Sequence, residues 1–535
     1  MRLWVAVACV LMAAAGGGRA AELVVRATQA RIHSTGKPIE GSGWLLGQNG
    51  EVGDWFVAPA GGTIEVAVKA SGTPAAGGWP IVWLVLVSPD GSEKGVHRFI
   101  ASSRDARVYH AKIEVQGGPF GLLVRFCNDV WDPRGGLNRD LVVYELSVSG
   151  VRLADHVLTL KDFTDAAIRK HRMGTLTILT APGAAVEVTQ VRHEFWFGTS
   201  MAWQFFRSPD TPDSRKYREM LKANFNAAIH EASLKWFHTE KKGGGKADYS
   251  DADRMLKWCE ANGIEVGSPC LFWAVPRFVP AWVKALDDAA LRANMERRAK
   301  EITSRYRGHI SEYILNNEML RSGYYRRRLG DGIVADMARW ARETDPDVRL
   351  YVNDYGVLQS GGATYAKHIR GLLDRGIPIG GIGIQGHCGG SISADKVKAT
   401  LDALAQFKLP IKITEFDMNT RDEEAKARGL ETLYRVAFAH PAMDGIIMWG
   451  FWVGSHWRPA AALWQRDWTP TPAAKAYRQL VFDEWWTRWE GRADEQGRCE
   501  LRVFYGTHRV KAGGETAEVK LGKQDGARVV RLGAP

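Results

Sequence analysis

Residues 313–320 have the sequence YILNNEML, an apolar run that ends in Asn316, Asn317 and Glu318. Apolar runs without strict alternation are typical of strands that are buried on both faces of a sheet. Burying a carboxylate is costly unless another group pairs with it or a reaction uses it. The stretch therefore predicts a buried strand whose last residues have a chemical task.

The same kind of run recurs between residues 195 and 486, where eight apolar runs alternate with amphipathic stretches of helical length. Strands that alternate with helices predict an α/β fold with a parallel sheet, and eight such units predict a (β/α)8 TIM barrel. The expected strands are 196–200, 227–231, 265–273, 313–318, 349–353, 381–385, 411–415 and 445–449. The expected helices include 252–262, 291–306, 332–343 and 396–407.

Polar residues stand where four of these expected strands end. Glu231, Glu318 and Glu415 each end a run, and Gln385 with His387 ends another. Active sites of such barrels lie at the carboxyl ends of the strands. We therefore expect an active site at this rim of the barrel.

Length and composition fit a folded protein of several domains. The chain has 535 residues, of which 45% are hydrophobic and 24% are charged. The net charge of +11 is spread along the sequence and is the only feature that favours nucleic acid, so we expect no nucleic-acid partner. The oligomeric state is left open.

The first 20 residues have the pattern of a signal peptide. Arg2 precedes an apolar stretch that runs to Ala15, and small residues follow it up to residue 20. We therefore expect export to the periplasm or the extracellular medium. No later stretch has the roughly 18 to 20 consecutive apolar residues of a membrane span, so we expect no membrane partner.

The remaining sequence predicts three further segments. Residues 21–150 contain short alternating runs that are broken by Gly, Pro and Asp, the pattern of an antiparallel β-sandwich. Residues 151–194 are expected to form a short β-rich connection to the barrel of residues 195–486, and residues 487–535 a small β extension. Five scattered cysteines outside the signal peptide fit buried thiols, with one bridge among them as an open alternative.

Two carboxyl groups at one rim predict glycosidic bond hydrolysis with retention. That reaction needs two carboxyl groups about 5 to 5.5 Å apart, one as nucleophile and one as acid and then base. Glu318 and Glu415 are the candidates. Asn317 is placed to bond the sugar 2-hydroxyl, and Asp417 with His387 to orient Glu415.

Several motifs in this region keep a defined order, and the chain resembles glycoside hydrolase family 10 through them. They are FGTSMA, FNAAIHEASLKW, GSPCLFWAVPRFVPAWV, RYRGHISEYILNNE, YVNDYGV, GIGIQGH, LPIKITEFDMNT and GIIMWGFWVGSHW. The resemblance is to the retaining endo-β-1,4-xylanases of that family, especially their plant-like branch, and covers residues from about 195 to 486.

This resemblance implies a role for each matching residue. Glu318 would be the acid/base and Glu415 the nucleophile, with no cofactor for catalysis. The residues expected to bind the polysaccharide are Asn317, Gln385 and His387 around the cleaved sugar, Glu231 and Lys235 at the preceding sugar, and Trp449 and Trp457 as a stacking floor. Trp273 is a further residue expected to bind the substrate.

Three positions depart from the family pattern. Ala232 replaces an asparagine, Pro269 replaces a histidine, and residues 313–316 replace the usual Trp-Asp-Val-Val. These changes leave two alternatives to a xylanase open. The first is the same mechanism on another β-linked or decorated glycan, and the second is a polysaccharide-binding protein without catalysis.

The N-terminal segment contains GGWPIVWLVLV and FCNDVWDPRGGLNRDLVVYELSVSG. Both stretches resemble small calcium-dependent xylan-binding modules, and the resemblance implies a calcium site that includes Asp129 and Asp140. A turn rich in Asp and Asn that closes a hairpin is the alternative interpretation.

A run of three arginines, residues 326–328, follows Glu318 closely. Because arginine pairs with carboxylates through two parallel hydrogen bonds, we considered the hypothesis that this run favours acidic side groups such as glucuronate. A solvated loop is the alternative.

Overall fold

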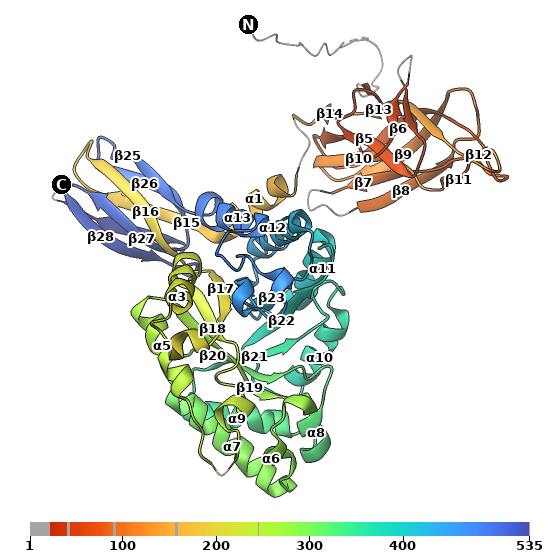
Figure 1. Ribbon diagram of the computed structural model, residues 1–535. Helices are drawn as coiled ribbons and strands as arrows, with labels where there is room; N and C mark the ends of the chain where they lie inside the picture. Colours follow the sequence, from red (N-terminus) through yellow and green to blue (C-terminus); the bar gives the residue numbers. More distant parts are fainter. Residues whose placement is uncertain (1–21, 40–42, 89–92, 156–158, 244, 534–535) are drawn as a thin grey trace. The chain divides into compact units, whose positions relative to one another are not determined.

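The computed structural model describes residues 22–39, 43–88, 93–155, 159–243 and 245–533 (Figure 1). The expected signal peptide, residues 1–20, lies outside the described residues. The chain divides into two compact units, Met1–Phe163 and Thr164–Pro535.

The first unit is a β-sandwich of two antiparallel six-stranded sheets. Alternation along its strands produces the core: in the strand from Gly62 to Gly72, Ile64, Val66, Val68 and Ala70 are buried. The strands are β1 (Glu22–Arg26), β2 (Ile32–His33), β3 (Lys37–Pro38), β4 (Trp44–Leu46), β5 (Gly50–Ala58), β6 (Gly62–Gly72), β7 (Ile81–Val87), β8 (Glu93–Ile100), β9 (Arg107–Val115), β10 (Gly118–Phe126), β11 (Trp131–Asp132), β12 (Leu137–Asn138), β13 (Leu141–Ser149) and β14 (Arg152–Leu153).

The two sheets share this core between their inner faces. One sheet has the order β3-β4-β13-β6-β9, with β1 beside β13, and the other has the order β14-β5-β10-β7-β8, with β2 beside β5. The short strands β11 and β12 form a separate hairpin. The sandwich predicted for this part of the chain is therefore confirmed.

The second unit contains the predicted barrel. Eight strands pair in chain order, and the last pairs with the first, so the barrel is closed. All eight pairings are parallel. The strands are β17 (Trp196–Met201), β18 (Ala227–His230), β19 (Glu265–Trp273), β20 (Glu312–Asn317), β21 (Arg349–Asp354), β22 (Gly381–Cys388), β23 (Ile411–Met418) and β24 (Met443–Met448).

Amphipathic helices surround the barrel (Figure 1). Helix α9 buries Ile333, Val334, Met337 and Trp340, which is the spacing of one helix face. The long helices are α3 (Pro212–Asn224), α5 (Ser250–Ala261), α7 (Asp288–Arg305), α9 (Ile333–Thr344), α10 (Ala363–Leu373), α11 (Ala394–Ala405), α12 (Glu423–Ala439) and α13 (Pro472–Arg478). Short helices are α2 (Gln204–Arg207), α4 (Trp236–Thr239), α6 (Ala281–Lys284) and α8 (Tyr324–Leu329), with helical turns at Pro276–Phe278, Val453–Ser455, Pro459–Ala461 and Gln479–Glu484.

Strands from both sides of the barrel sequence form one β module. The strands before the barrel are β15 (Met173–Leu179) and β16 (Ala185–His193), and those after it are β25 (Arg488–Arg492), β26 (Arg498–Phe504), β27 (Gly506–Ala512), β28 (Glu515–Leu521) and β29 (Ala527–Arg531). Strand β15 pairs with β26 and β29, and β16 pairs with β25 and β27. The segment expected to be a separate connection and the expected C-terminal extension thus share one core.

The segment before the barrel also contains a helix that we did not predict, α1 (Leu160–Arg172). It buries Thr164, Ile168 and Arg172, one residue in each turn. Its last turn contains four basic residues, which suits the negative end of a helix dipole. The helix is amphipathic despite its many charged residues, so its hydrophobic periodicity was a signal that the sequence analysis did not use.

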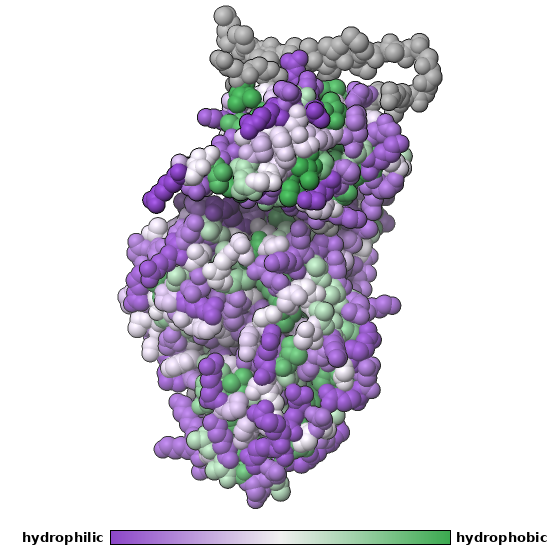
Figure 2. Space-filling model, turned by 90° about the vertical axis from the view of Figure 1, so that its right-hand side faces the viewer, coloured by the Kyte–Doolittle hydropathy of each residue, from purple (hydrophilic) through white to green (hydrophobic). Residues whose placement is uncertain are grey.

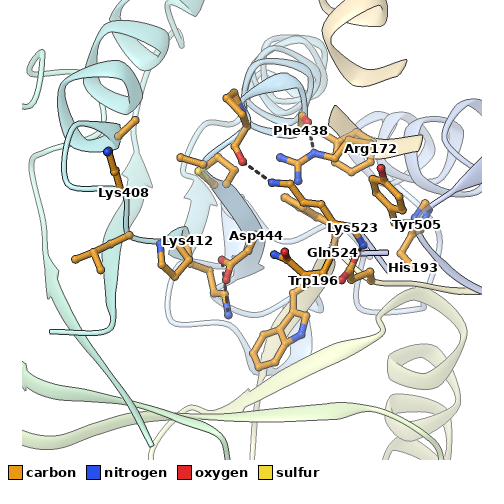
Figure 3. Close-up of a pocket in the computed structure, with 18 of the residues that line it drawn as sticks. Arg172, His193, Trp196, Lys408, Lys412, Phe438, Asp444, Tyr505, Lys523 and Gln524 are labelled. Carbon is orange, nitrogen blue, oxygen red and sulfur yellow. Dashed lines mark hydrogen bonds and ion pairs between the residues drawn. The ribbon is translucent and has the colours of Figure 1, made fainter. Parts of the chain in front are cut away.

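Cations from this helix and from the β module hold the module to the barrel. Arg172 donates a hydrogen bond of 2.6 Å to the carbonyl oxygen of Phe438 (Figure 3), and a second of 2.6 Å to that of His440, at the end of α12. Lys523, after β28, donates to the carbonyl oxygen of Pro441 at 2.7 Å. These carbonyls lack partners within the helix, so the two cations cap it. A cavity of about 760 Å³ lies beside them at this end of the barrel.

Hydrophilic residues cover most of the face that Figure 2 shows, and hydrophobic residues occur there in small separate groups. Within the described ranges, no helix is both long and apolar enough to cross a membrane.

All five described cysteines are free thiols, four of them buried and Cys127 exposed, so the alternative of a bridge among them is wrong.

We expect a chain that ends at residue 486 to be insoluble or unfolded. This truncation removes β25 to β29 and would expose Leu176, Ile178, Val186 and Val188, which now pack against those strands. A chain that starts at residue 159 keeps the whole module and is expected to melt cooperatively. Solubility and circular dichroism of the two truncated chains test this, and a stable barrel in the chain ending at 486 would contradict it.

Candidate active site

The candidate carboxylates lie at the rim formed by the carboxyl ends of the strands. Glu415 is in β23, and Glu318 follows the last residue of β20. Glu318 adopts a left-handed backbone conformation with φ 61°, which is uncommon for a residue other than glycine. Its backbone N–H donates to the carbonyl oxygen of Asn353 on the neighbouring strand at 2.9 Å. The strained conformation is therefore held by the next strand, as is common at functional sites.

A chain of amide groups links the two carboxylates. Gln385 Nε2 and Asn317 Nδ2 donate to Glu318 Oε1 at 3.0 and 3.2 Å. Asn353 Nδ2 lies 2.9 Å from both Asn317 Oδ1 and Glu415 Oε1. Both carboxylates are buried, with exposed fractions of 8% and 6%. The amides compensate part of the cost of burying two like charges at one rim.

The two oxygens of Glu318 differ in a way that suits an acid. Oε1 accepts two hydrogen bonds, whereas Oε2 accepts none from the described residues. Both oxygens of Glu415 are occupied, Oε1 by Asn353 and Oε2 by His387. Glu318 therefore has an oxygen that can carry and transfer a proton, while Glu415 is held as an oriented anion.

His387 lies between two carboxylates. Its Nε2 is 3.2 Å from Glu415 Oε2, and its Nδ1 is 2.8 Å from Asp417 Oδ2. Burial lowers the pKa of His387, but the hydrogen bonds and charges of Asp417 and Glu415 outweigh burial and raise it to about 9. The imidazole is therefore charged at neutral pH and donates to both carboxylates. Asp417 also accepts from Trp457 Nε1 at 2.8 Å and pairs with Arg458 at 3.2 Å.

The residues expected to bind the preceding sugar gather on the other part of the rim. Lys235 Nζ lies 4.6 Å from the ring centroid of Trp273 and 5.2 Å from that of Trp449. Burial, with the charge of Glu415, raises the pKa of Glu231, and the charge of Lys235 opposes this shift. Trp457 is 50% exposed, so its ring is open to a ligand. A cation, a carboxylate and aromatic rings are the groups that bind a pyranose.

The sequence model of Glycosyl hydrolase family 10 matches residues 189–480. The chain belongs to this family. The matched range contains all eight barrel strands and every candidate residue at the rim.

Two curated relatives match the chain over similar lengths. Anti-sigma-I factor RsgI6 of Acetivibrio thermocellus is 35% identical over 61% of this chain and 42% of its own length. Endo-1,4-beta-xylanase 1 of Arabidopsis thaliana is 34% identical over 62% of this chain and 34% of its own length. The chain thus spans less than half of the length of either relative.

Solved structures of the family share the fold. Native xylanase 10B from Thermotoga maritima matches with a TM-score of 0.50 and 22% identity, over 54% of this chain and 96% of that one. At this identity the likeness concerns the fold alone. It agrees with the closed barrel of the second unit.

Sequence reasoning missed one member of this family 10 site, Asn353. It is the residue that connects Asn317 to Glu415, and Thr414 Oγ1 donates to its Oδ1 at 2.6 Å. The signal was present, because Asn353 ends the expected strand 349–353. By contrast, Asn316 is buried, but its Oδ1 accepts no hydrogen bond from the described residues.

The three arginines after Glu318 do not act together. Arg326 donates to the carbonyl oxygen of Met319 at 3.1 Å, and Arg328 pairs with Asp288 at 2.7 Å. Arg327 is exposed. Two of the guanidinium groups thus hold the α8 segment in place, and the hypothesis that the run favours acidic side groups stays a prediction.

The cavity at the other end of the barrel is not part of this site. Its lining includes Arg172, Trp196, Lys412 and Asp444 and none of the candidate residues of the rim (Figure 3). Lys412 there is buried and pairs with Glu312 at 2.6 Å. That end of a barrel usually serves stability.

We expect His387 to make stability depend on pH. Folding raises its pKa from 6.5 to about 9, so the stabilisation is complete below pH 6.5 and is lost as the pH rises through 9. The difference in unfolding free energy between the unaltered protein and H387N should shrink over this interval, by roughly 3 kcal/mol at most. Urea denaturation at a series of pH values measures it, and a constant difference would contradict the proposed charge on His387.

Proposed function

We propose that this family 10 chain is a retaining endo-1,4-β-xylanase. The observation that carries the proposal is the pair Glu318 and Glu415, which one amide network holds at the barrel rim. The Arabidopsis relatives named endo-1,4-beta-xylanase 1, 2 and 3, at 31 to 34% identity, support the choice of xylan as substrate. The polysaccharide would lie across the rim, with one sugar between the two carboxyl groups.

The geometry assigns one task to each group in the first step. Protonated Glu318 gives its proton to the glycosidic oxygen as the bond to the leaving sugar breaks. Glu415 attacks the anomeric carbon and forms a glycosyl ester. His387 and Asn353 keep the two oxygens of Glu415 in place, so little reorganisation is needed during the attack.

The second step uses the same two carboxyl groups. Glu318, now ionised, removes a proton from water, and the water oxygen attacks the anomeric carbon. The bond to Glu415 breaks, and the product keeps the original anomeric configuration. Both steps need only groups of the chain and water.

Two alternatives to a xylanase are tested as well. Ala232 and Pro269 depart from the family pattern on the glycone side, which favours a related β-linked or decorated glycan with the same mechanism. The relative from Acetivibrio is named an anti-sigma factor, and a chain that binds polysaccharide without cutting it is the other alternative. Product analysis on xylan, mixed-linkage glucan and cellulose separates these possibilities.

We also propose that the protein is exported and that its sandwich binds glycans. The pattern of residues 1–20 supports export, and the likeness of the sandwich motifs to xylan-binding modules supports glycan binding. Trp131 of the β11–β12 hairpin is 68% exposed and offers an open ring to a sugar. Neither nucleic acid nor a membrane is proposed as a partner.

Calcium in the sandwich belongs to the same proposal. Asp129 Oδ1 and Asp140 Oδ1 are both buried and accept no hydrogen bond from the described residues. Burial and the charge of Asp129 raise the pKa of Asp140, while its hydrogen bond from Asn138 lowers it. The described residues include no group of three or more His, Cys, Asp or Glu that could hold a metal. Carbonyl, amide or water oxygens would therefore complete the six to eight that calcium takes.

We expect E415Q to lose about 10³-fold or more in kcat on xylan and on an aryl β-xylobioside, because the nucleophile is needed for both. E318Q should lose about 10² to 10⁴-fold on xylan but far less in the glycosylation step on the aryl substrate, whose leaving group needs no proton. E424Q, at an exposed glutamate of α12, is the matched control.

Proton NMR of the first product gives the anomeric configuration. An inverted product, or equal activity of E415Q and the unaltered protein, would contradict the proposed mechanism.

We expect calcium to raise the melting temperature of the sandwich. The ion binds the folded state and shifts unfolding by mass action, and D140N should abolish the shift. Differential scanning calorimetry with calcium and with a chelator measures it. An unchanged melting temperature in both conditions would contradict the calcium site and leave the activity proposal unaffected.

A further inference from the structure

The loop after Glu318 presents an arginine that the mechanism above does not use. Arg321 is exposed, and its guanidinium carbon lies 5.4 Å from the ring centroid of Tyr355. Tyr355 is itself 44% exposed. A cation over an aromatic face is attracted by the ring and is held in place by it. The guanidinium is thus positioned at the surface rather than moving freely in solvent.

A buried carboxylate fixes the two loops that bring these residues together. Asp354 Oδ2 accepts from the backbone N–H of Leu320 at 2.7 Å, and its Oδ1 accepts from the backbone N–H of Tyr355 at 3.0 Å. Arg321 is the next residue after Leu320. Gly356 leaves room for the guanidinium, since a Cβ built there would lie 3.0 Å from Arg321 Nη2. The two loops that Asp354 fixes therefore hold Arg321 close to Glu318.

Arg321 forms no ion pair with a carboxylate among the described residues, although its charge acts on buried Asp354 and opposes the rise in the pKa of that group that burial causes. Its side chain is otherwise exposed to solvent. Arg458 on the other part of the rim also covers an aromatic ring, that of Trp457 at 4.1 Å. Arg458, however, pairs with Asp417 at 3.2 Å. Of these two arginines at the rim, Arg321 is the one that can accept an anionic ligand.

The position of Arg321 indicates on which side of the cleaved bond its ligand would lie. Glu231 and Lys235, which the family resemblance assigns to the sugar before the cut, follow β18. Arg321 follows β20 and lies over the end of β21, on the other part of the closed barrel. The proton donor Glu318 is three residues before it. The ligand of Arg321 would therefore belong to the leaving part of the polysaccharide.

We infer that Arg321 binds a carboxylate on the leaving-group side of Glu318, so that the enzyme favours polysaccharides that carry uronic acid side groups. This inference rests on the proposed function. Carboxylate is the anion that such side groups supply, and the planar guanidinium can bond both of its oxygens. The selectivity thus lies in a single arginine of this loop rather than in the following run of three.

The test compares two xylo-oligosaccharides with the same backbone, one plain and one with a glucuronate side group. The measured quantity is the ratio of kcat/KM for the decorated substrate to kcat/KM for the plain one. We expect R321Q to lower this ratio by about threefold to tenfold, the range for an exposed charge-assisted pair. R327Q, at an exposed arginine of α8, is the matched control and is expected to keep the ratio.

A second substrate separates charge from size. The methyl ester of the decorated oligosaccharide keeps the bulk of the side group and removes its charge. With the ester, the unaltered protein and R321Q should give the same ratio. Increasing ionic strength should lower the ratio for the unaltered protein and change R321Q little.

Equal ratios for the unaltered protein and R321Q on the charged substrate would overturn the inference, even if R321Q lost activity on both substrates in the same proportion. A difference that persists with the ester would also overturn it. If the unaltered protein cuts neither oligosaccharide, the proposed function fails, and the inference fails with it.

Discussion

The buried carboxylates at the rim depend on groups that neighbouring strands supply. Glu415 lies opposite Gln385, and Asp417 lies opposite His387, in the register between β23 and β22. A shift of that register by one residue would turn these side chains away from each other. The amides and the imidazolium meet the carboxylates only because the closed barrel fixes all four of the strands concerned. Closure of the barrel is thus a condition for the chemistry as well as for the fold.

This dependence explains why the site needs so many polar residues that do not touch the reacting bond. An unpaired carboxylate in this position would be destabilising or would take up a proton. Gln385, Asn353 and His387 offset the cost of burial by donating hydrogen bonds to one or the other carboxylate. Their donors also direct the lone pairs of Glu318 and Glu415. The same hydrogen bonds therefore serve stability and function at once.

The barrel could be predicted from the sequence because its strands are buried on both faces and its helices on one. Those two patterns differ clearly in composition, and the polar strand ends identified Glu318 and Glu415. Asn353 also ends an expected strand, but it was missed because its task depends on hydrogen bonds to residues of neighbouring strands that are distant in sequence. The pairing of β15 with β29 was missed for the same reason. Arg321 has no signal of its own in the sequence, since only the contact with Tyr355 distinguishes it from other surface arginines.

The β module has a consequence for the order in which the chain acquires its structure. Strands β15 and β16 are synthesised before the barrel, yet their partners are at the far end of the polypeptide. During translation the edges of these two strands stay unpaired until the whole barrel has left the ribosome. Such high contact order slows folding and prolongs the exposure of aggregation-prone edges. The barrel strands are therefore complete before the module is, but the unit becomes stable only when β25 to β29 pair with β15 and β16.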